Sequence, residues 1–176
     1  GISIMKIAEE LDSGPVSNIY KIKLDQNDNA EEISEKLSLL AAEKILDNID
    51  DILEDKAKFI DQDHSKVSYA KKIKKSEGKI NWNENALKII GKINGLFPVP
   101  GAFFNFGGER YKILRAKSGN GVGQVGEVLS NKLEIACGNN ESIRILEIQR
   151  QGKKIQKIED FILGSNIKKG SLISND

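Results

Sequence analysis

Between residues 69 and 82 the chain reads Tyr69-Ala-Lys-Lys-Ile-Lys-Lys-Ser-Glu-Gly-Lys-Ile-Asn-Trp82, with five lysines between two aromatic residues. This stretch separates two parts of opposite charge. Residues 1–63 carry 7 Lys and Arg against 16 Asp and Glu, a net charge of −9. Residues 64–176 carry 20 against 10, a net charge of +10, so the overall charge of +1 hides the asymmetry. Such asymmetry indicates a polyanionic partner for the second part.

Composition limits the class of protein. A chain of 176 residues with 39 % hydrophobic residues can form one large domain or two small ones with a packed core. No run approaches the roughly 18 apolar residues that span a bilayer, and no secretory signal is present, which predicts no membrane partner. The single cysteine and single histidine indicate a reducing, cytoplasmic location and no metal site.

The pattern of the acidic part, residues 1–63, is typical of the end of an α/β domain. Apolar residues predict strands over residues 2–7 and 16–24, joined by the loop Leu11-Asp-Ser-Gly-Pro15. Three- and four-residue apolar spacing predicts a helix over residues 30–53, with two glutamates in its first turn. Two strands and a helix cannot bury much surface. Since the chain also begins at Gly1 directly in a strand-like run, we expect its natural start to lie upstream.

The basic part reads as a helix followed by strands. Residues 83–95 are predicted to form a helix with one apolar stripe, and Asn83 could cap its start. Gly95 ends this helix, and Pro98 and Pro100 prevent it from continuing. Five short strands follow at residues 102–106, 110–116, 126–130, 133–137 and 142–148. A short helix over 157–163 and a last segment over 170–173 close the chain. Short strands separated by regular turn signals are typical of a small barrel.

Few residues are placed for chemistry. Asp12 follows a strand and could orient a base or a proton, although a loop-capping aspartate is the commoner explanation of this pattern. Glycines 119, 121, 123 and 126 lack the Lys-Ser/Thr ending and following helix of a phosphate loop, which favours a flexible hairpin loop. We interpret His64 as an exposed residue and Cys137 as a core residue.

The lysines point to nucleic acid. We expect Lys71, Lys72, Lys74, Lys75 and Lys79, with the later pair Lys153 and Lys154, to contact phosphates, although lysines on a solvated surface would give the same composition. Another basic pair, Lys168 and Lys169, lies near the end of the chain, and one hairpin carries the basic residues Arg110, Lys112, Arg115 and Lys117. Only Tyr69, Trp82 and Tyr111 accompany these charges. We therefore expect recognition of a folded nucleic acid by shape and charge rather than by base stacking.

Several motifs resemble, in order along the chain, those of bacterial methionyl-tRNA formyltransferase. They are Gly1-Ile-Ser-Ile-Met5, Glu10-Leu-Asp-Ser-Gly14, Val67-Ser-Tyr-Ala-Lys-Lys-Ile73, Gly78-Lys-Ile-Asn-Trp82, Phe97-Pro-Val-Pro-Gly-Ala-Phe103, Gln149-Arg-Gln-Gly-Lys-Lys154 and Asp160-Phe-Ile-Leu-Gly164. Asn81 and Val99 depart from the aspartate and tryptophan usual in that family. The resemblance implies an α+β chain: the C-terminal remnant of a Rossmann-like α/β formyltransferase domain, then a small OB-like β-barrel.

The resemblance also implies domains, residue roles and partners. Residues 1–54 would complete the catalytic domain, 55–79 would be a basic linker, and 80–176 would be the tRNA-binding domain. Asp12 would be the catalytic aspartate, and Glu10, Leu11 and Asp12 would border the pocket for the donor 10-formyltetrahydrofolate. The acceptor would be initiator methionyl-tRNA, bound through the seven lysines at 71, 72, 74, 75, 79, 153 and 154. The family's Asn and His lie upstream of Gly1, so this chain alone would be inactive, and the intact enzyme would be a monomer.

Two other functions stay open. The chain could be a stand-alone basic RNA-binding module, or part of a related enzyme such as a sugar-nucleotide formyltransferase or a folate hydrolase. An Asn-x-His pattern encoded upstream of Gly1 would favour the formyltransferase over the module. The net charge of +10 in the second part favours tRNA over a small acceptor.

Overall fold

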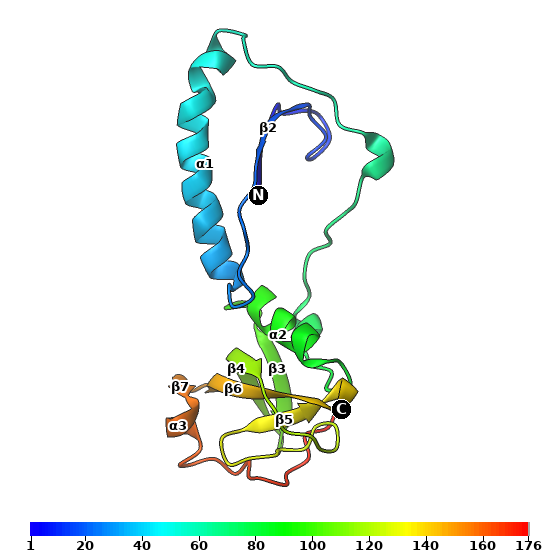
Figure 1. Cartoon of the computed structure of the whole chain (residues 1–176), viewed down its shortest axis with the longest axis vertical. Helices are drawn as coiled ribbons and strands as arrows, with labels where there is room; N and C mark the ends of the chain where they lie inside the picture. Colours follow the sequence, from blue (N-terminus) through cyan, green and yellow to red (C-terminus); the bar gives the residue numbers. More distant parts are fainter. Residues whose placement is uncertain (176) are drawn as a thin grey trace. The chain divides into compact units, whose positions relative to one another are not determined.

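The computed structural model describes residues 1–175 and divides into two compact units, Gly1–Lys72 and Ile73–Asp176 (Figure 1). The division falls inside the stretch 55–79 that the sequence suggests as a linker. Both units combine helices with antiparallel strands, in agreement with the α+β class. None of the helices formed by residues 1–175 is long and apolar enough to span a membrane.

A two-stranded sheet begins the first unit. Strand β1 (Ile2–Met5) pairs antiparallel with β2 (Val16–Tyr20), and Ile2 lies opposite Tyr20. The prediction that the second strand continues to Leu24 is wrong, because residues 21–24 lie beyond the last paired position and have no strand opposite them. Ile60 extends the sheet through an isolated bridge to Val16.

Helix α1 (Ala30–Leu53) has the predicted bounds, and local signals explain its start. The Asn29 side chain accepts from the Glu32 amide at 2.9 Å, and the Glu32 carboxylate accepts from the Asn29 amide at 3.0 Å, which forms a capping box. Asn48 donates to the Tyr20 hydroxyl at 2.8 Å and ties the helix to β2. No residue of α1 is buried. A short 3-10 turn, η1 (His64–Lys66), follows.

The second unit begins with the 3-10 turn η2 (Lys75–Gly78) and helix α2 (Ala86–Gly95), which packs against the sheet (Figure 1). Asn85 caps α2 by accepting from the Lys88 amide at 2.9 Å. The prediction that Asn83 caps this helix is wrong, because the Asn83 amide is held in a turn by the Asn81 side chain at 3.1 Å. The helix therefore starts three residues later than expected.

A curled antiparallel sheet forms the body of the second unit. Its strands are β3 (Ala102–Phe106), β4 (Glu109–Ser118), β5 (Glu134–Cys137), β6 (Glu141–Arg150) and β7 (Ile155–Lys157). Their order is β3-β4-β6-β5, with β7 pairing with β6. The turn η3 (Gly138–Asn140) joins β5 to β6, and α3 (Ile158–Phe161) follows β7. The helix expected over 157–163 is shorter, because Lys157 belongs to β7 and the helix ends at Phe161.

The strand predicted over 126–130 does not form. This segment makes one isolated bridge on each side, Val128 with Ile135 and Glu127 with Leu172, which is too little pairing for a ladder. Gly126 has a φ of 84°, and a Cβ at this position would collide with the Ile173 carbonyl oxygen. The backbone of residues 126–130 therefore bends between β5 and residues 170–173. The fifth strand of the sheet is β7, which the sequence did not predict.

The buried apolar core of the described residues lies between Ile80 and Ile173, entirely in the second unit. A chain of aromatic rings runs through it: Trp82 meets Phe104 at a centroid distance of 5.9 Å, Phe104 stacks on Tyr111 at 5.4 Å, and Tyr111 meets Phe161 at 5.9 Å. The aromatic residue that ends the lysine stretch, Trp82, is thus a core residue with no exposed surface.

Candidate functional site

The loop that carries Asp12 is a closed turn in the first unit. The Lys6 amide donates to the Pro15 carbonyl at 3.0 Å across its base. Gly14 is required there, because an added Cβ would collide with the Lys6 carbonyl oxygen. Asp12 has a left-handed backbone with a φ of 55°, a conformation that aspartate tolerates better than most residues. The loop therefore fixes the position of the Asp12 backbone.

Gln62 restrains this loop from the connector, the segment of residues 54–72 that follows α1 in the first unit. No signal of this restraint is present in the sequence. Its side-chain amide donates to the Asp12 carbonyl at 2.8 Å and to the Gly14 carbonyl at 2.7 Å. The Asp12 carboxylate is exposed and accepts no hydrogen bond from residues 1–175, so the loop-capping explanation of this aspartate is not supported. Gln62 lies 50 residues from Asp12, and no local pattern signals such a contact.

The lysines of the central stretch lie in both units. Lys71 and Lys72 end the first unit, with exposed side chains and no regular structure. Lys74 and Lys75 are exposed at the start of η2, where the Lys74 amide donates to the Glu77 carboxylate at 2.6 Å. Lys79 is half-buried, because it lies beside Phe103 in an isolated parallel bridge.

The bridge at Lys79 starts a row of side chains that crosses the sheet. Paired positions place Phe103 beside Lys112, then Lys112 beside Gln149, and Gln149 beside Ile155. Side chains at paired positions point to the same face of a sheet. The Arg110 guanidinium lies 4.1 Å from the Phe103 ring centroid on this face. The outer face of β3 and β4 therefore carries Lys79, Arg110 and Lys112.

An irregularity in the pairing of β4 with β6 keeps the later cations of β4 on the same face. The register is shifted at Arg115, which pairs with Glu147, and it is restored at Ala116, which pairs with Ile145. The buried residues Ile113 and Ala116 are therefore three positions apart, which breaks the two-residue alternation of the strand. Arg115 and Lys117 are exposed, as Arg110 is before the irregularity. The irregularity thus brings together four basic residues that strict alternation would have divided between two faces.

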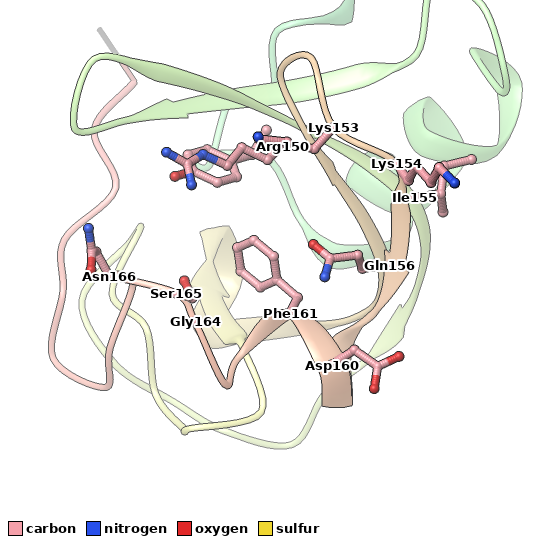
Figure 2. A pocket seen from close by; sticks show the side chains of 11 residues that line it. Arg150, Lys153, Lys154, Ile155, Gln156, Asp160, Phe161, Gly164, Ser165 and Asn166 are labelled. Atoms are coloured by element: carbon pink, nitrogen blue, oxygen red, sulfur yellow. The ribbon is translucent and has the colours of Figure 1, made fainter.

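Lys153 and Lys154 lie in the turn between β6 and β7, with exposed side chains. The Lys153 amide donates to the Arg150 carbonyl at 3.0 Å, and the Lys153 carbonyl accepts from the Gln149 side chain at 2.9 Å. A cavity of about 550 Å³ opens beside this turn (Figure 2). The sequence did not predict it, because its lining is assembled from β4, the β6–β7 hairpin, α3 and residues 164–166.

The glycine-rich loop after β4 encloses a carboxylate of the protein itself. Glu134 accepts from the amides of Asn120 and Gly121, both at 2.8 Å, and from Arg144 at 3.0 Å. Burial raises the pKa of Glu134, but these hydrogen bonds, together with one from Ser142, outweigh burial and lower the pKa to about 2. Because the loop amides already bind a carboxylate, the structure agrees with the prediction that this is no phosphate loop.

The two remaining candidates lie as predicted. Burial raises the pKa of the Cys137 thiol to about 11, which leaves almost no thiolate at neutral pH. His64 is exposed in η1, within the connector.

A family model defines the class of protein. Residues 72–166 match the C-terminal domain of formyl transferases. The chain is 64 % identical to methionyl-tRNA formyltransferase of Pelagibacter ubique over 99 % of its length, and 40 % identical to that of Rickettsia massiliae over 98 %. The chain spans 56 % and 57 % of the lengths of these relatives, little more than half.

Solved structures share the fold. HypX from Aquifex aeolicus matches with a TM-score of 0.71 and 16 % identity, over 95 % of this chain and 32 % of HypX. Methionyl-tRNA formyltransferase from Clostridium thermocellum matches with a TM-score of 0.50 and 27 % identity, over 68 % of this chain and 51 % of that protein. The chain belongs to the formyltransferase family, and the resemblance to methionyl-tRNA formyltransferase predicted from its motifs is confirmed.

Proposed function

We propose that this chain forms the C-terminal portion of an enzyme that formylates initiator methionyl-tRNA, with 10-formyltetrahydrofolate as the formyl donor. The observation that carries the proposal is the 64 % identity to methionyl-tRNA formyltransferase of Pelagibacter ubique along 99 % of this chain. In that reaction the methionine amino group attacks the formyl carbon. The bond from that carbon to the folate nitrogen breaks, and the amine proton passes to the departing nitrogen.

Asp12 would act in the first unit as the catalytic aspartate of this reaction. Its exposed carboxylate is available to hold a proton or to orient a histidine, and Gln62 fixes the backbone at Asp12 and Gly14. Glu10 and Leu11 precede it in the same loop, and the Leu11 side chain is 96 % exposed, which would suit contact with the folate. A structure of HypX in complex with tetrahydrofolic acid has the same fold and supports a folate site.

The finer description of the fold belongs to the same proposal. The first unit would complete a Rossmann-like domain, to which the exposed apolar residues Leu39, Leu46 and Leu53 of α1 are suited as packing surface. The second unit would be an OB-like barrel, because residues 126–128 bond to β5 on one side and to residues 170–173 on the other. The whole enzyme would act as a cytoplasmic monomer without a metal.

The tRNA would bind through the lysines of both units, at positions 71, 72, 74, 75, 79, 153 and 154. The row that begins at Lys79 adds Arg110 and Lys112 to this surface. Distributed cations bind phosphates without reading bases, and each neutralised phosphate releases a counterion. Affinity for tRNA should therefore fall steeply with salt.

A titration of initiator tRNA against salt tests the binding half of the proposal. We expect the double variant K79Q/K112Q to reduce the slope of log affinity against log salt by about 1 to 2, because two phosphate contacts are lost. Replacing the exposed turn residue Lys132 by Gln is the matched control and should leave the slope unchanged. A flat salt response of the unmodified chain would exclude tRNA as its partner.

A formyl-transfer assay tests the catalytic half. We expect no turnover with the 176-residue chain, and turnover when the chain is extended at its N-terminus to the full length of its relatives. In the extended protein, Asp12→Asn should lower kcat at least about 100-fold, as expected for loss of a group that handles a proton. Turnover by the 176-residue chain alone would contradict the proposal that catalysis requires residues N-terminal to this chain.

A further inference from the structure

Cationic, polar and aromatic side chains line the cavity beside the β6–β7 turn (Figure 2). Its volume of about 550 Å³ lies within the range of about 300–1,000 Å³ that is typical of ligand pockets. We propose that this cavity binds a single unpaired nucleotide of the RNA, with its base inside and its phosphate at the lysine turn. The proposal deepens the proposed tRNA-binding function and rests on it for the source of the nucleotide.

One edge of the cavity is cationic. Lys153 and Lys154 lie there with exposed side chains and form no ion pair with residues 1–175. Arg150 stands beside them, but its guanidinium is paired with the Glu109 carboxylate. Asp160 lies at another edge, away from the lysine turn in Figure 2. The two lysines therefore supply the charge that a phosphate would meet.

The interior offers a polar group that the protein does not use. Gln156 lies opposite Ile148, a fully buried residue, so its side chain points to the inner face of the sheet. It is half-buried, and its amide forms no hydrogen bond with residues 1–175. Figure 2 shows this amide directed toward the Phe161 ring. An inward position of a strand normally carries an apolar residue, whereas the Gln156 amide opens into the cavity without a protein partner and can bond a polar ligand there.

Two aromatic rings and a hydroxyl in the lining suit a base. Tyr111 and Phe161 meet at a centroid distance of 5.9 Å and line the cavity, each with 6 % of its surface exposed. Ser165, buried at the other side, accepts from the Ile167 amide at 3.0 Å and keeps its hydroxyl proton for another acceptor. A side-chain amide and a hydroxyl beside aromatic carbon match the edge and face of a nucleobase. Phosphate alone would leave this part of the cavity unfilled.

Nuclear magnetic resonance on the 176-residue chain tests the ligand class without tRNA. The side-chain amide signal of Gln156 can be assigned by its disappearance in Gln156→Leu. We expect millimolar AMP, GMP, CMP or UMP to shift this signal and the Ser165 amide, whereas inorganic phosphate shifts only signals at Lys153 and Lys154. Nucleotides that leave the Gln156 signal in place, or phosphate that shifts it equally, would overturn the nucleotide site.

Measurements of tRNA binding distinguish the contribution of the cavity from that of the surface charge. Gln156→Leu should weaken tRNA affinity about three- to tenfold at constant salt slope, because a hydrogen bond is lost but no phosphate contact. The control Gln124→Leu makes the same chemical change at an exposed position outside the cavity and should have no effect. The pair K153A/K154A should instead lower the salt slope by about 1 to 2.

The outcomes are distinguishable. If tRNA binds with a steep salt slope and Gln156→Leu binds like the unmodified chain, the nucleotide site is overturned and the proposed function stands. If mononucleotides shift the Gln156 signal but tRNA does not bind, the site is supported as a nucleotide pocket and the proposed tRNA function fails. If neither binds, both are overturned.

Discussion

At the scale of single residues, Glu134 organises the loop that follows β4. It is 6 % exposed and accepts hydrogen bonds from two loop amides, Ser142 and Arg144. Added Cβ atoms at Gly119 and Gly121 would crowd its carboxylate, which explains two of the glycines. A buried carboxylate is stabilising only when it is ionised and fully bonded. Glu134 meets both conditions, since its pKa is lowered to about 2.

Glu134 predicts a specific dependence of stability on pH. Its pKa is about 2 in the folded protein against an ordinary value of 4.5, so its contribution is complete above pH 4.5 and is lost as the pH falls toward 2. A difference of this size corresponds to about 3 kcal/mol. We expect Glu134→Gln to lower the free energy of unfolding of the second unit by about 2–4 kcal/mol at pH 7 and to remove much of the acid dependence.

Denaturant unfolding followed by the fluorescence of Trp82, at several pH values, measures this effect. The control Glu159→Gln removes an exposed carboxylate from α3 and should change stability by less than about 0.5 kcal/mol. Equal stability of Glu134→Gln and the unmodified chain at pH 7 would show that the carboxylate is not required.

At the scale of elements, the irregular pairing of β4 with β6 and the turn around Asp12 both place candidate site residues. The register irregularity at Arg115 keeps Arg115 and Lys117 on the outward face. In the first unit, Gln62 bonds the carbonyls of Asp12 and Gly14 and so couples the connector to the loop. In each case a contact distant in sequence decides where a charged group points.

We predict that Gln62→Ala loosens the Asp12 loop. Loss of two hydrogen bonds of about 1 kcal/mol each should speed amide exchange at Lys6, whose amide closes the loop base, by about tenfold or more. Hydrogen exchange followed by nuclear magnetic resonance reads this amide directly. Asp61→Ala alters the exposed neighbouring residue and is the control. Unchanged exchange at Lys6 would mean that Gln62 does not hold the loop.

At the scale of the whole molecule, apolar burial is unequal between the two units. All buried apolar side chains of the described residues lie in the second unit, whereas the first unit exposes Leu39, Leu46 and Leu53 on α1. A helix without a buried face has little packing to stabilise it. The two units should therefore differ in stability.

We predict two unfolding transitions for the chain. The helical circular dichroism signal, to which the 24-residue α1 contributes most, should decrease at lower denaturant than the Trp82 fluorescence changes. Ile135→Ala in the core should shift only the fluorescence transition, by about 2–5 kcal/mol. Leu46→Lys, at a residue that is 73 % exposed, should shift neither. A single coincident transition would contradict this separation.

Much of the architecture follows from short-range patterns. The bounds of α1 follow from apolar periodicity and the Asn29–Glu32 capping box, and β3, β4 and β6 follow from alternation and turn residues. The errors arise where a segment depends on partners elsewhere. Residues 126–130 alternate as a strand does, but their backbone bonds are divided between β5 and residues 170–173. Gly138 bonds the carbonyls of Trp82 and Glu84, a contact that no local pattern signals.

By itself, the sequence determined the charge division, most helices and strands, the identity of the Asp12 loop as a candidate site, and the resemblance to methionyl-tRNA formyltransferase. Only the tertiary structure decided that Gln62 holds that loop, that Glu134 fills the glycine-rich loop, and that a cavity opens beside Lys153. The reason is physical: caps, turns and periodicity depend on residues a few positions apart, whereas these contacts join side chains from distant elements that only the folded chain brings together.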